Sequence, residues 1–256
     1  MTEASYTCDG AVYTPTDYVT GPWDPTLSHA GPPAGLLVDV IARSDADMGI
    51  TRVTFEIPKG IPKVPATISL TELRPGRKIR LVEATLADLA GVPLMVARAW
   101  LIRVSDDDLP RSDPFPMEFP PPESCDPLEF PHRGIGYMDA VEMRRISGNP
   151  FRGGPAAIWI RQTMPLVAGH ETDAYARCGV FGDLGNGISA MESMRDLMAV
   201  NTDLTLYLAR RPVSEWMAMR SETVSHGFGL GISDSLVYDA SGFVGTANQS
   251  LFIDRR

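Results

Sequence analysis

The stretch FGDLGNGIS, residues 181–189, is rich in glycine and carries a single carboxylate, Asp183. We expect it to lead into a helix over residues 190–199 and then a strand over residues 200–208. Unpaired backbone N–H groups at a helix start favour negative charge, so a carboxylate there can position water while the N–H groups stabilise an oxyanion. The same residue types also form an ordinary cap and turn, and this stretch alone does not decide between the two.

Composition places the chain among globular proteins. Its 256 residues suffice for one large domain or two small ones, with 44% hydrophobic and 21% charged residues. The net charge is −9, and the densest group of cations, over residues 74–80, is short. These features exclude a nucleic-acid partner, because a phosphate backbone is bound through clustered Lys and Arg. That basic group is typical of a solvated hairpin, with a phosphate contact as the alternative.

The cysteines and histidines favour neither a disulfide framework nor a metal site. The three cysteines are far apart in the sequence and the four histidines are scattered. We therefore expect no metal and no cofactor. The first residues lack a signal peptide, and no window reaches the roughly 18 apolar residues of a membrane span. We expect a cytoplasmic protein with no membrane partner.

The first half reads as a helix followed by an antiparallel meander. A hairpin is expected within residues 1–20. Pro32 and Pro33 fit the first turn of a helix that continues over residues 34–43 and is apolar on almost every side. Alternating apolar and polar residues then predict four strands, over residues 51–57, 66–73, 78–86 and 92–104.

The second half follows a Pro- and Asp-rich segment that can form neither a helix nor a central strand. A short helix is expected over residues 173–178. Strands are expected over residues 156–163, 215–223, 232–238 and 243–254. The chain is therefore divided into a first unit at 1–104, a linker at 105–150 and a second unit at 151–256.

The two halves repeat each other at an offset of 150 residues, which predicts an α+β architecture with two copies of a helix wrapped by an antiparallel sheet. The offset places Asp183, Asn201 and Gln249 against three residues without matching polar groups, Pro33, Thr51 and Ala99. Either the second copy is specialised for a function, or three surface polar residues align by chance.

Several segments together resemble a known family. They are GPWDP at 21–25, HAGPPA at 29–34, DLGNGIS at 183–189, NTDLT at 201–205 and PVSEW at 212–216. They are similar to acyl-CoA thioesterase II proteins of the actinobacterial type, over nearly the whole chain except the linker. The resemblance implies a double hotdog fold and the hydrolysis of an acyl-CoA substrate to a free acid and CoA. It also implies a homo-oligomer, a dimer or larger.

The resemblance assigns the catalytic set to Asp183, Asn201 and Gln249, which would orient the attacking water. Asn201 departs from the pattern, because the best known members have a hydroxyl residue at that position. Backbone N–H groups of Gly187 and Ile188 are expected to form an oxyanion site. Contacts with the substrate are expected from His29, Gly31 and Arg77.

Two other functions are compatible with such a fold. A hotdog enoyl-CoA hydratase would pair an Asp and a His within one motif, but the residue five after Asp183 is Ile188 and no His follows nearby. A non-catalytic protein that binds acyl-CoA or lipid would need no such carboxylate, and Asp183 argues against it only weakly. A serine hydrolase is disfavoured because the G-x-S-x-G elbow is missing from the sequence.

Overall fold

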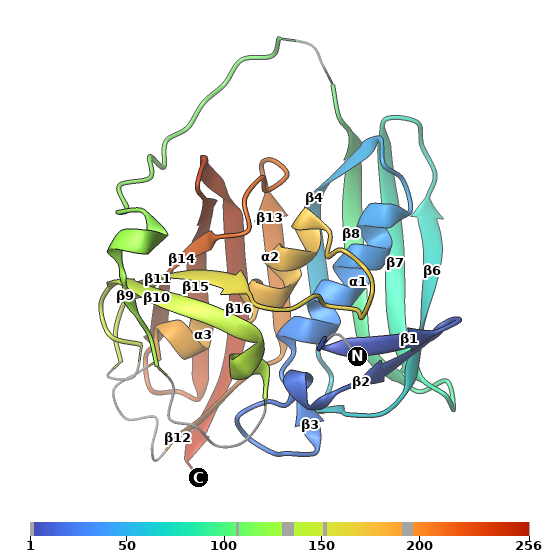
Figure 1. Cartoon of the computed structure of the whole chain (residues 1–256), viewed down its shortest axis with the longest axis horizontal. Coiled ribbons are helices and arrows are strands. Elements are labelled where there is room, and N and C mark those ends of the chain that lie inside the picture. The colour runs from blue at the N-terminus through green and yellow to red at the C-terminus, as the bar shows by residue number, and fades with distance from the viewer. Residues whose placement is uncertain (1–2, 106–107, 130–135, 151–152, 191–196, 256) are drawn as a thin grey trace.

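A computed structural model describes residues 3–105, 108–129, 136–150, 153–190 and 197–255 (Figure 1). Within these ranges, fourteen strands form one antiparallel sheet, and two helices, α1 (Gly31–Arg43) and α2 (Ala174–Gly182), pack side by side. Figure 1 shows both helices against one face of the curved sheet, α1 over β4, β7 and β8 and α2 over β13. The predicted α+β architecture is therefore confirmed.

The first half contains the elements that alternation predicted. α1 begins with Pro32 and Pro33 in its first turn, and nearly all of its side chains are buried. The strands that wrap it bury every second residue, as β7 does at Val82, Ala84 and Leu86. The bounds are β1 (Tyr6–Asp9), β2 (Val12–Pro15), β3 (Leu27–Ser28), β4 (Met48–Glu56), β5 (Ile61–Pro62), β6 (Ala66–Arg74), β7 (Ile79–Asp88) and β8 (Pro93–Arg103), with a 3-10 turn η1 (Asp17–Val19).

The second half repeats this plan. Its helical elements are α2, the one-turn helix α3 (Gly185–Ile188) and two 3-10 turns, η2 (Pro122–Ser124) and η3 (Tyr137–Ala140). Its strands are β9 (Asp126–Pro127), β10 (Val141–Ser147), β11 (Ala156–Gln162), β12 (Leu197–Asn201), β13 (Asp203–Leu208), β14 (Met217–Ser225), β15 (Leu230–Asp239) and β16 (Gly242–Arg255).

The sheet is symmetric about the pair formed by β4 and β13. Thr54 lies opposite Thr205 at this centre. From there the order runs through β8, β7, β6, β2 and β1 on one side, and through β16, β15, β14, β11 and β10 on the other. The two halves therefore share one continuous sheet, and their helices share one core beneath it.

The helix predicted over residues 190–199 is wrong where the structure describes it, because Leu197 already begins β12. Residues 191–196 lie outside the described ranges. The helix of this half is instead α2, which the short helix predicted over residues 173–178 overlaps, and Asp183 forms its C-cap. The glycines of residues 181–189 and the helix-favouring residues after them led to the wrong prediction. The buried helix is formed by the less regular sequence before Asp183.

The segment predicted as a linker contributes to the fold. β10 lies within residues 105–150 and pairs with β11, as β1 pairs with β2 in the first half. Trp159 on β11 donates its ring N–H to Pro120 O at 2.8 Å, which fixes the Pro-rich stretch to the sheet. The unit boundaries at 104 and 150 stay a prediction. In the described ranges, no helix has the length and apolarity that crossing a membrane requires.

Candidate active site

The crossing of α1 and α2 brings the start of one helix to the end of the other. Three glycines lie at this crossing, Gly31 and Gly35 on α1 and Gly179 on α2. A Cβ on Gly179 would lie 2.9 Å from the backbone of Ala34, and one on Gly31 would lie 2.3 Å from Val180 O. Only glycine allows the backbones to come this close. Asp183, at the end of α2, consequently lies beside the first residues of α1.

Two amide side chains from neighbouring strands hold the Asp183 carboxylate. Asn201, at the end of β12, donates its Nδ2 to Asp183 Oδ1 at 2.8 Å. Gln249, on β16, donates its Nε2 to the same oxygen at 3.1 Å and to Asp183 O at 3.2 Å. The Gln249 Oε1 accepts the N–H of Asn186 at 3.0 Å, which fixes the orientation of the amide. The three predicted catalytic residues are thus in contact.

His29 contacts the second carboxylate oxygen. Its Nδ1 lies 3.0 Å from Asp183 Oδ2 and accepts the N–H of Gly31 at 3.0 Å. The imidazole stacks on the ring of Tyr137, with 4.2 Å between centroids, and the Tyr137 hydroxyl donates to Val180 O at 2.9 Å. His29 and Gly31, two of the predicted substrate contacts, therefore lie in the same group as Asp183.

Burial controls the electrostatics of this group. The Asp183 side chain is only 6% exposed. Desolvation raises the pKa of Asp183, while His29, Asn201 and the backbone N–H groups of Ala30 and Gly31 lower it. Burial lowers the pKa of His29, and the Asp183 charge opposes this. The raised pKa means that Asp183 holds a proton more strongly than an aspartate in water does.

The other predicted residues lie differently. Gly187 is exposed, and a Cβ there would meet nothing within 4 Å, so its backbone faces open space. Ile188 is buried, and its N–H donates to Leu184 O at 2.8 Å. That N–H is engaged within α3, which contradicts its predicted role as an oxyanion donor. Arg77 lies in the turn between β6 and β7, away from this group.

The true counterpart of Asp183 in the first half is Asp39, not Pro33. α1 and α2 run antiparallel, and Asp39 Oδ1 accepts the N–H of Asp173 at the start of α2, at 2.9 Å. Asp183 holds the same relation to the start of α1. However, Arg43 donates to both oxygens of Asp39, from Nε at 2.6 Å and from Nη2 at 3.2 Å. The first-half carboxylate is thereby paired with a cation instead of facing two amides.

The register also corrects the counterpart of Asn201. Asn201 lies opposite Leu251, and Ile50 lies opposite Leu101. Because Leu101 and Leu251 are related by the same offset as Ala99 and Gln249, the counterpart of Asn201 is Ile50 and not Thr51. A register shift after Ile50 displaces Thr51. The pairing of Gln249 with Ala99 is consistent with this register. Asn201 and Gln249 thus have buried apolar counterparts, Ile50 and Ala99.

Sequence reasoning missed Tyr137, which walls the group through its stack on His29. It stands in η3, inside the segment predicted as a linker, and its side chain is buried. A single tyrosine in a segment predicted as a linker gives little indication that it belongs to a functional site. The sequence also gave no indication that the buried hydroxyl groups of Ser233 and Ser235 lie near this group, where they pack against Gly185.

Comparison with known proteins follows the same two-part division. The model of the acyl-CoA thioesterase N-terminal domain matches residues 19–102, and the model of the C-terminal domain matches residues 122–253. No curated protein sequence matches the chain.

Solved structures share the fold at low sequence identity. A conserved protein of unknown function with hot dog fold from Alicyclobacillus acidocaldarius has a TM-score of 0.76 and 14% identity, covering 97% of this chain and 95% of its own. The tesB protein of Mycobacterium avium subs paratuberculosis has a TM-score of 0.71 and 14% identity, covering 95% and 93%. Acyl-CoA thioesterase II TesB2 from Mycobacterium marinum has a TM-score of 0.68 and 14% identity, covering 98% and 94%. These likenesses confirm two tandem hotdog units.

Proposed function

Because this chain belongs to the acyl-CoA thioesterase family and is a thioester hydrolase, we propose that Asp183, Asn201 and Gln249 direct a water at an acyl-CoA thioester. The products are a free acid and CoA. The observation that carries the residue assignment is the Asp183 carboxylate, buried beside the start of α1 with two amide donors on one oxygen. Asn201 replaces the hydroxyl residue of the best known members with another hydrogen-bonding group.

The proposed step needs only one base. Asp183 takes a proton from the water as the water oxygen attacks the thioester carbonyl carbon, forming a tetrahedral oxyanion. The carbon–sulfur bond then breaks, and the proton returns from Asp183 to the departing sulfur or to solvent. A thiol of pKa about 8.5 leaves with little assistance, so no strong general acid is required. The exposed backbone at Gly187 is the candidate oxyanion donor.

The two amides have distinct duties in this scheme. Gln249 is held through both ends of its amide, so it fixes the Asp183 carboxylate relative to α3. Asn201 lies at a strand end with its Nδ2 on Asp183, which leaves its side-chain oxygen available to accept a proton of the attacking water. Such positioning converts a collision with bulk water into a reaction within one complex.

The test is a thiol-release assay with acyl-CoA substrates of several chain lengths, comparing the natural chain with Asp183→Asn. We expect release of CoA for at least one length and a loss of about 10²–10⁴-fold in kcat for the variant, the usual contribution of a general base. Full activity in Asp183→Asn would reject the residue assignment. No free CoA at any length would reject hydrolysis and favour the non-catalytic binding protein, which calorimetry with the same substrates would then detect.

The cytoplasm and a homo-oligomer are further parts of the proposal. The oligomer rests on the family resemblance, and the cytoplasm rests on the three widely spaced cysteines, which fit a reducing compartment. Size-exclusion chromatography with light scattering tests the oligomer directly, and a monomeric mass at micromolar concentration would reject it.

A further inference from the structure

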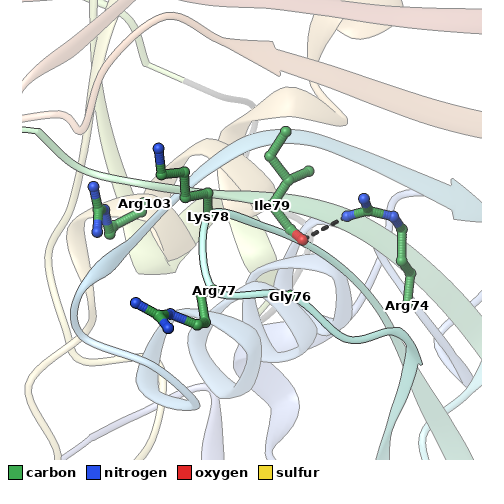
Figure 2. A pocket seen from close by; sticks show the side chains of 6 residues that line it. All are labelled: Arg74, Gly76, Arg77, Lys78, Ile79 and Arg103. Carbon is green, nitrogen blue, oxygen red and sulfur yellow. Dashed lines mark hydrogen bonds between the residues drawn. The ribbon is translucent and has the colours of Figure 1, made fainter.

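An open surface cavity of about 400 Å³, lined by exposed residues, lies at the hairpin between β6 and β7. Four of the six residues that line it are cations, and the others are Gly76 and Ile79 (Figure 2). The cations are Arg74, Arg77, Lys78 and Arg103. Figure 2 shows the side chains of Lys78, Arg103 and Arg77 on one side of the hairpin, with Arg74 on the other side of Ile79.

Three of these cations have no acidic partner among the residues that the structure describes. Arg74 is engaged, because it donates to Ile79 O at 2.6 Å and lies over the ring of Trp100. In contrast, no carboxylate among the described residues lies within ion-pair distance of Arg77, Lys78 or Arg103. Such a concentration of unpaired positive charge is unexpected on a chain whose net charge is −9. Like charges held together repel, so a counter-charge would stabilise this corner.

The neighbouring arginine shows that acidic partners were available to this hairpin. Arg80 lies two residues after Lys78 and pairs with Asp45 at 2.6 Å and with Glu72 at 2.7 Å. Arg80 is the cation paired with both of these carboxylates, and Asp45 also accepts the N–H of Asp47 at 3.1 Å. The cations that face the cavity are thus left unpaired beside a fully paired arginine, and they remain available to a ligand.

The fold itself does not require cations at this corner. The symmetry-related hairpin joins β14 to β15, and Phe228 and Leu230 stand there at the positions of Arg77 and Ile79. Both of these side chains are strongly exposed. One backbone arrangement therefore carries a basic turn in the first half and an apolar turn in the second. The positive charge is therefore not needed to fold this hairpin, which leaves ligand binding as a reason for it.

The cavity is also separate from the Asp183 group. Arg80 links the start of β7 to Asp45, which follows the C-terminal end of α1. Asp183 lies at the N-terminal end of the same helix, whose 13 residues span about 20 Å. The predicted contact of Arg77 with the substrate at the Asp183 group is therefore not supported by its position.

We propose that this cavity is a second binding site, which takes a small anion carrying linked phosphates. Three unpaired cations match the charge of a diphosphate better than that of a single carboxylate, and guanidinium groups bind phosphate oxygens through paired N–H donors. A nucleotide and inorganic pyrophosphate share this group, so the class of ligand is the diphosphate itself.

The test is calorimetry at constant ionic strength with inorganic pyrophosphate, ADP, phosphate and acetate as probes. We expect saturable binding of pyrophosphate at one site per chain, with phosphate weaker and acetate undetectable. Tighter binding of ADP than of pyrophosphate would identify a nucleotide as the source of the diphosphate, and the reverse order would identify the inorganic ion. Equal weak binding of all four probes would overturn the proposal.

The variant Arg77→Ala/Lys78→Ala/Arg103→Ala supplies the specific control, because all three side chains are exposed and the variant should keep its Tm. We expect it to weaken pyrophosphate binding by at least about tenfold, whereas Lys59→Ala, which removes an exposed lysine after β4, should change it by less than about twofold. Equal losses in both variants would reduce the effect to net charge and reject a site.

A further readout separates this site from the proposed hydrolysis. Pyrophosphate should not compete with acyl-CoA in the thiol-release assay. Competitive inhibition that disappears in the triple variant would place the cavity within the substrate site and overturn its separation. Calorimetry needs no turnover, so it tests the binding of pyrophosphate even if the chain releases no CoA.

Discussion

At the scale of single residues, Asp183 combines burial with stabilising donors. Burial alone would favour its protonated form, whereas the amides of Asn201 and Gln249 favour the carboxylate. The balance leaves its pKa raised. A base of raised pKa holds a proton more strongly, which favours proton transfer from water.

The first prediction concerns the pH profile of hydrolysis. Since the pKa of Asp183 is raised, kcat/KM should fall on acidification at a pH above the ordinary value for aspartate, about 3.9. The measurement is kcat/KM from pH 4 upward, with a check at each pH that the protein stays folded. An acid limb at or below the ordinary aspartate value would contradict the raised pKa.

The second prediction concerns stability. A carboxyl group whose pKa is raised on folding stabilises the fold below its unfolded pKa, and this contribution is lost as pH rises through the folded pKa. Asp183→Asn should therefore have a higher Tm than the natural chain at neutral pH, and the two values should converge on acidification. Thermal unfolding of both proteins from neutral to acidic pH measures the difference between their Tm values. The other titrating groups are the same in both proteins, so they do not contribute to this difference. A variant that is less stable at pH 7 would show that the donors outweigh burial.

The third prediction isolates His29. His29→Phe keeps a ring against Tyr137 but removes the nitrogen that faces Asp183. Because His29 lowers the pKa of Asp183, the acid limb of kcat/KM should move to higher pH, with about a tenfold loss below the limb for each pKa unit moved. Tyr137→Phe retains the stack and should leave the limb in place. Equal displacement in the two variants would assign the effect to packing.

At the scale of elements, the site depends on how closely α1 and α2 cross. Gly179 faces the backbone of Ala34 and Gly35, where a methyl group would lie at 2.9 Å. Backbone atoms cannot move aside as a flexible side chain can. A larger residue would therefore separate the helices and displace Asp183 from the start of α1.

The fourth prediction follows from that crossing. Gly179→Ala should cost about 1–3 kcal/mol of unfolding free energy, the usual penalty for overpacking, and should also lower kcat. Urea unfolding and the thiol-release assay measure the two effects. Gly187→Ala is the matched control for stability, because its methyl group would meet nothing within 4 Å. A similar loss of stability in both variants would mean that the crossing is not the cause.

Strands were predictable from the sequence and helices only in part. Alternation located β4, β6, β7 and β8 to within a few residues, and β4, β7 and β8 bury alternate residues toward α1 whereas β6 is mostly exposed. The second helix was predicted over residues 173–178, but its continuation to Gly182 was not. α2 is assembled from small residues around Gly179, a composition set by its close contact with α1 and not by helical preference. No single-chain pattern reveals such a contact.

The contact between Asp183, Asn201 and Gln249, the proposed catalytic set, was predictable from the sequence, but the counterparts of these residues in the first half were not. A single offset of 150 residues holds for Ala99 and Gln249, but Asp39 lies only 144 residues before Asp183. Extra residues between helix and strand in the second half change the offset, so Asp183 was matched with Pro33. Comparing the two halves by a single sequence offset cannot show where these extra residues lie. The contact of Asp39 with the start of α2 in the structure identifies the correct pairing.

At the scale of the whole molecule, the site belongs to both halves. Asp183, Asn201 and Gln249 come from the second, while His29 and the N–H groups of Ala30 and Gly31 come from the first. The second unit alone contains the proposed base but not the residues that set its environment.

The fifth prediction tests this dependence. Residues 105–256 expressed alone should release no CoA, and addition of residues 1–104 should restore release if the two pieces reassemble through β4 and β13. Co-purification of the pieces reports assembly, and the thiol-release assay reports function. Full activity in the second piece alone would show that His29 and the start of α1 are dispensable.

The ion pair between Arg43 and Asp39 has a consequence for stoichiometry. The chain contains two related helix ends, each with a buried aspartate, but Asp39 is paired with Arg43. Asp183 is held by amide groups instead, so it is the aspartate proposed to act on the attacking water. A tight inhibitor that mimics the tetrahedral intermediate should therefore saturate at one equivalent per chain, not two. In an assembly of several chains, the number of bound inhibitor molecules would count the chains directly.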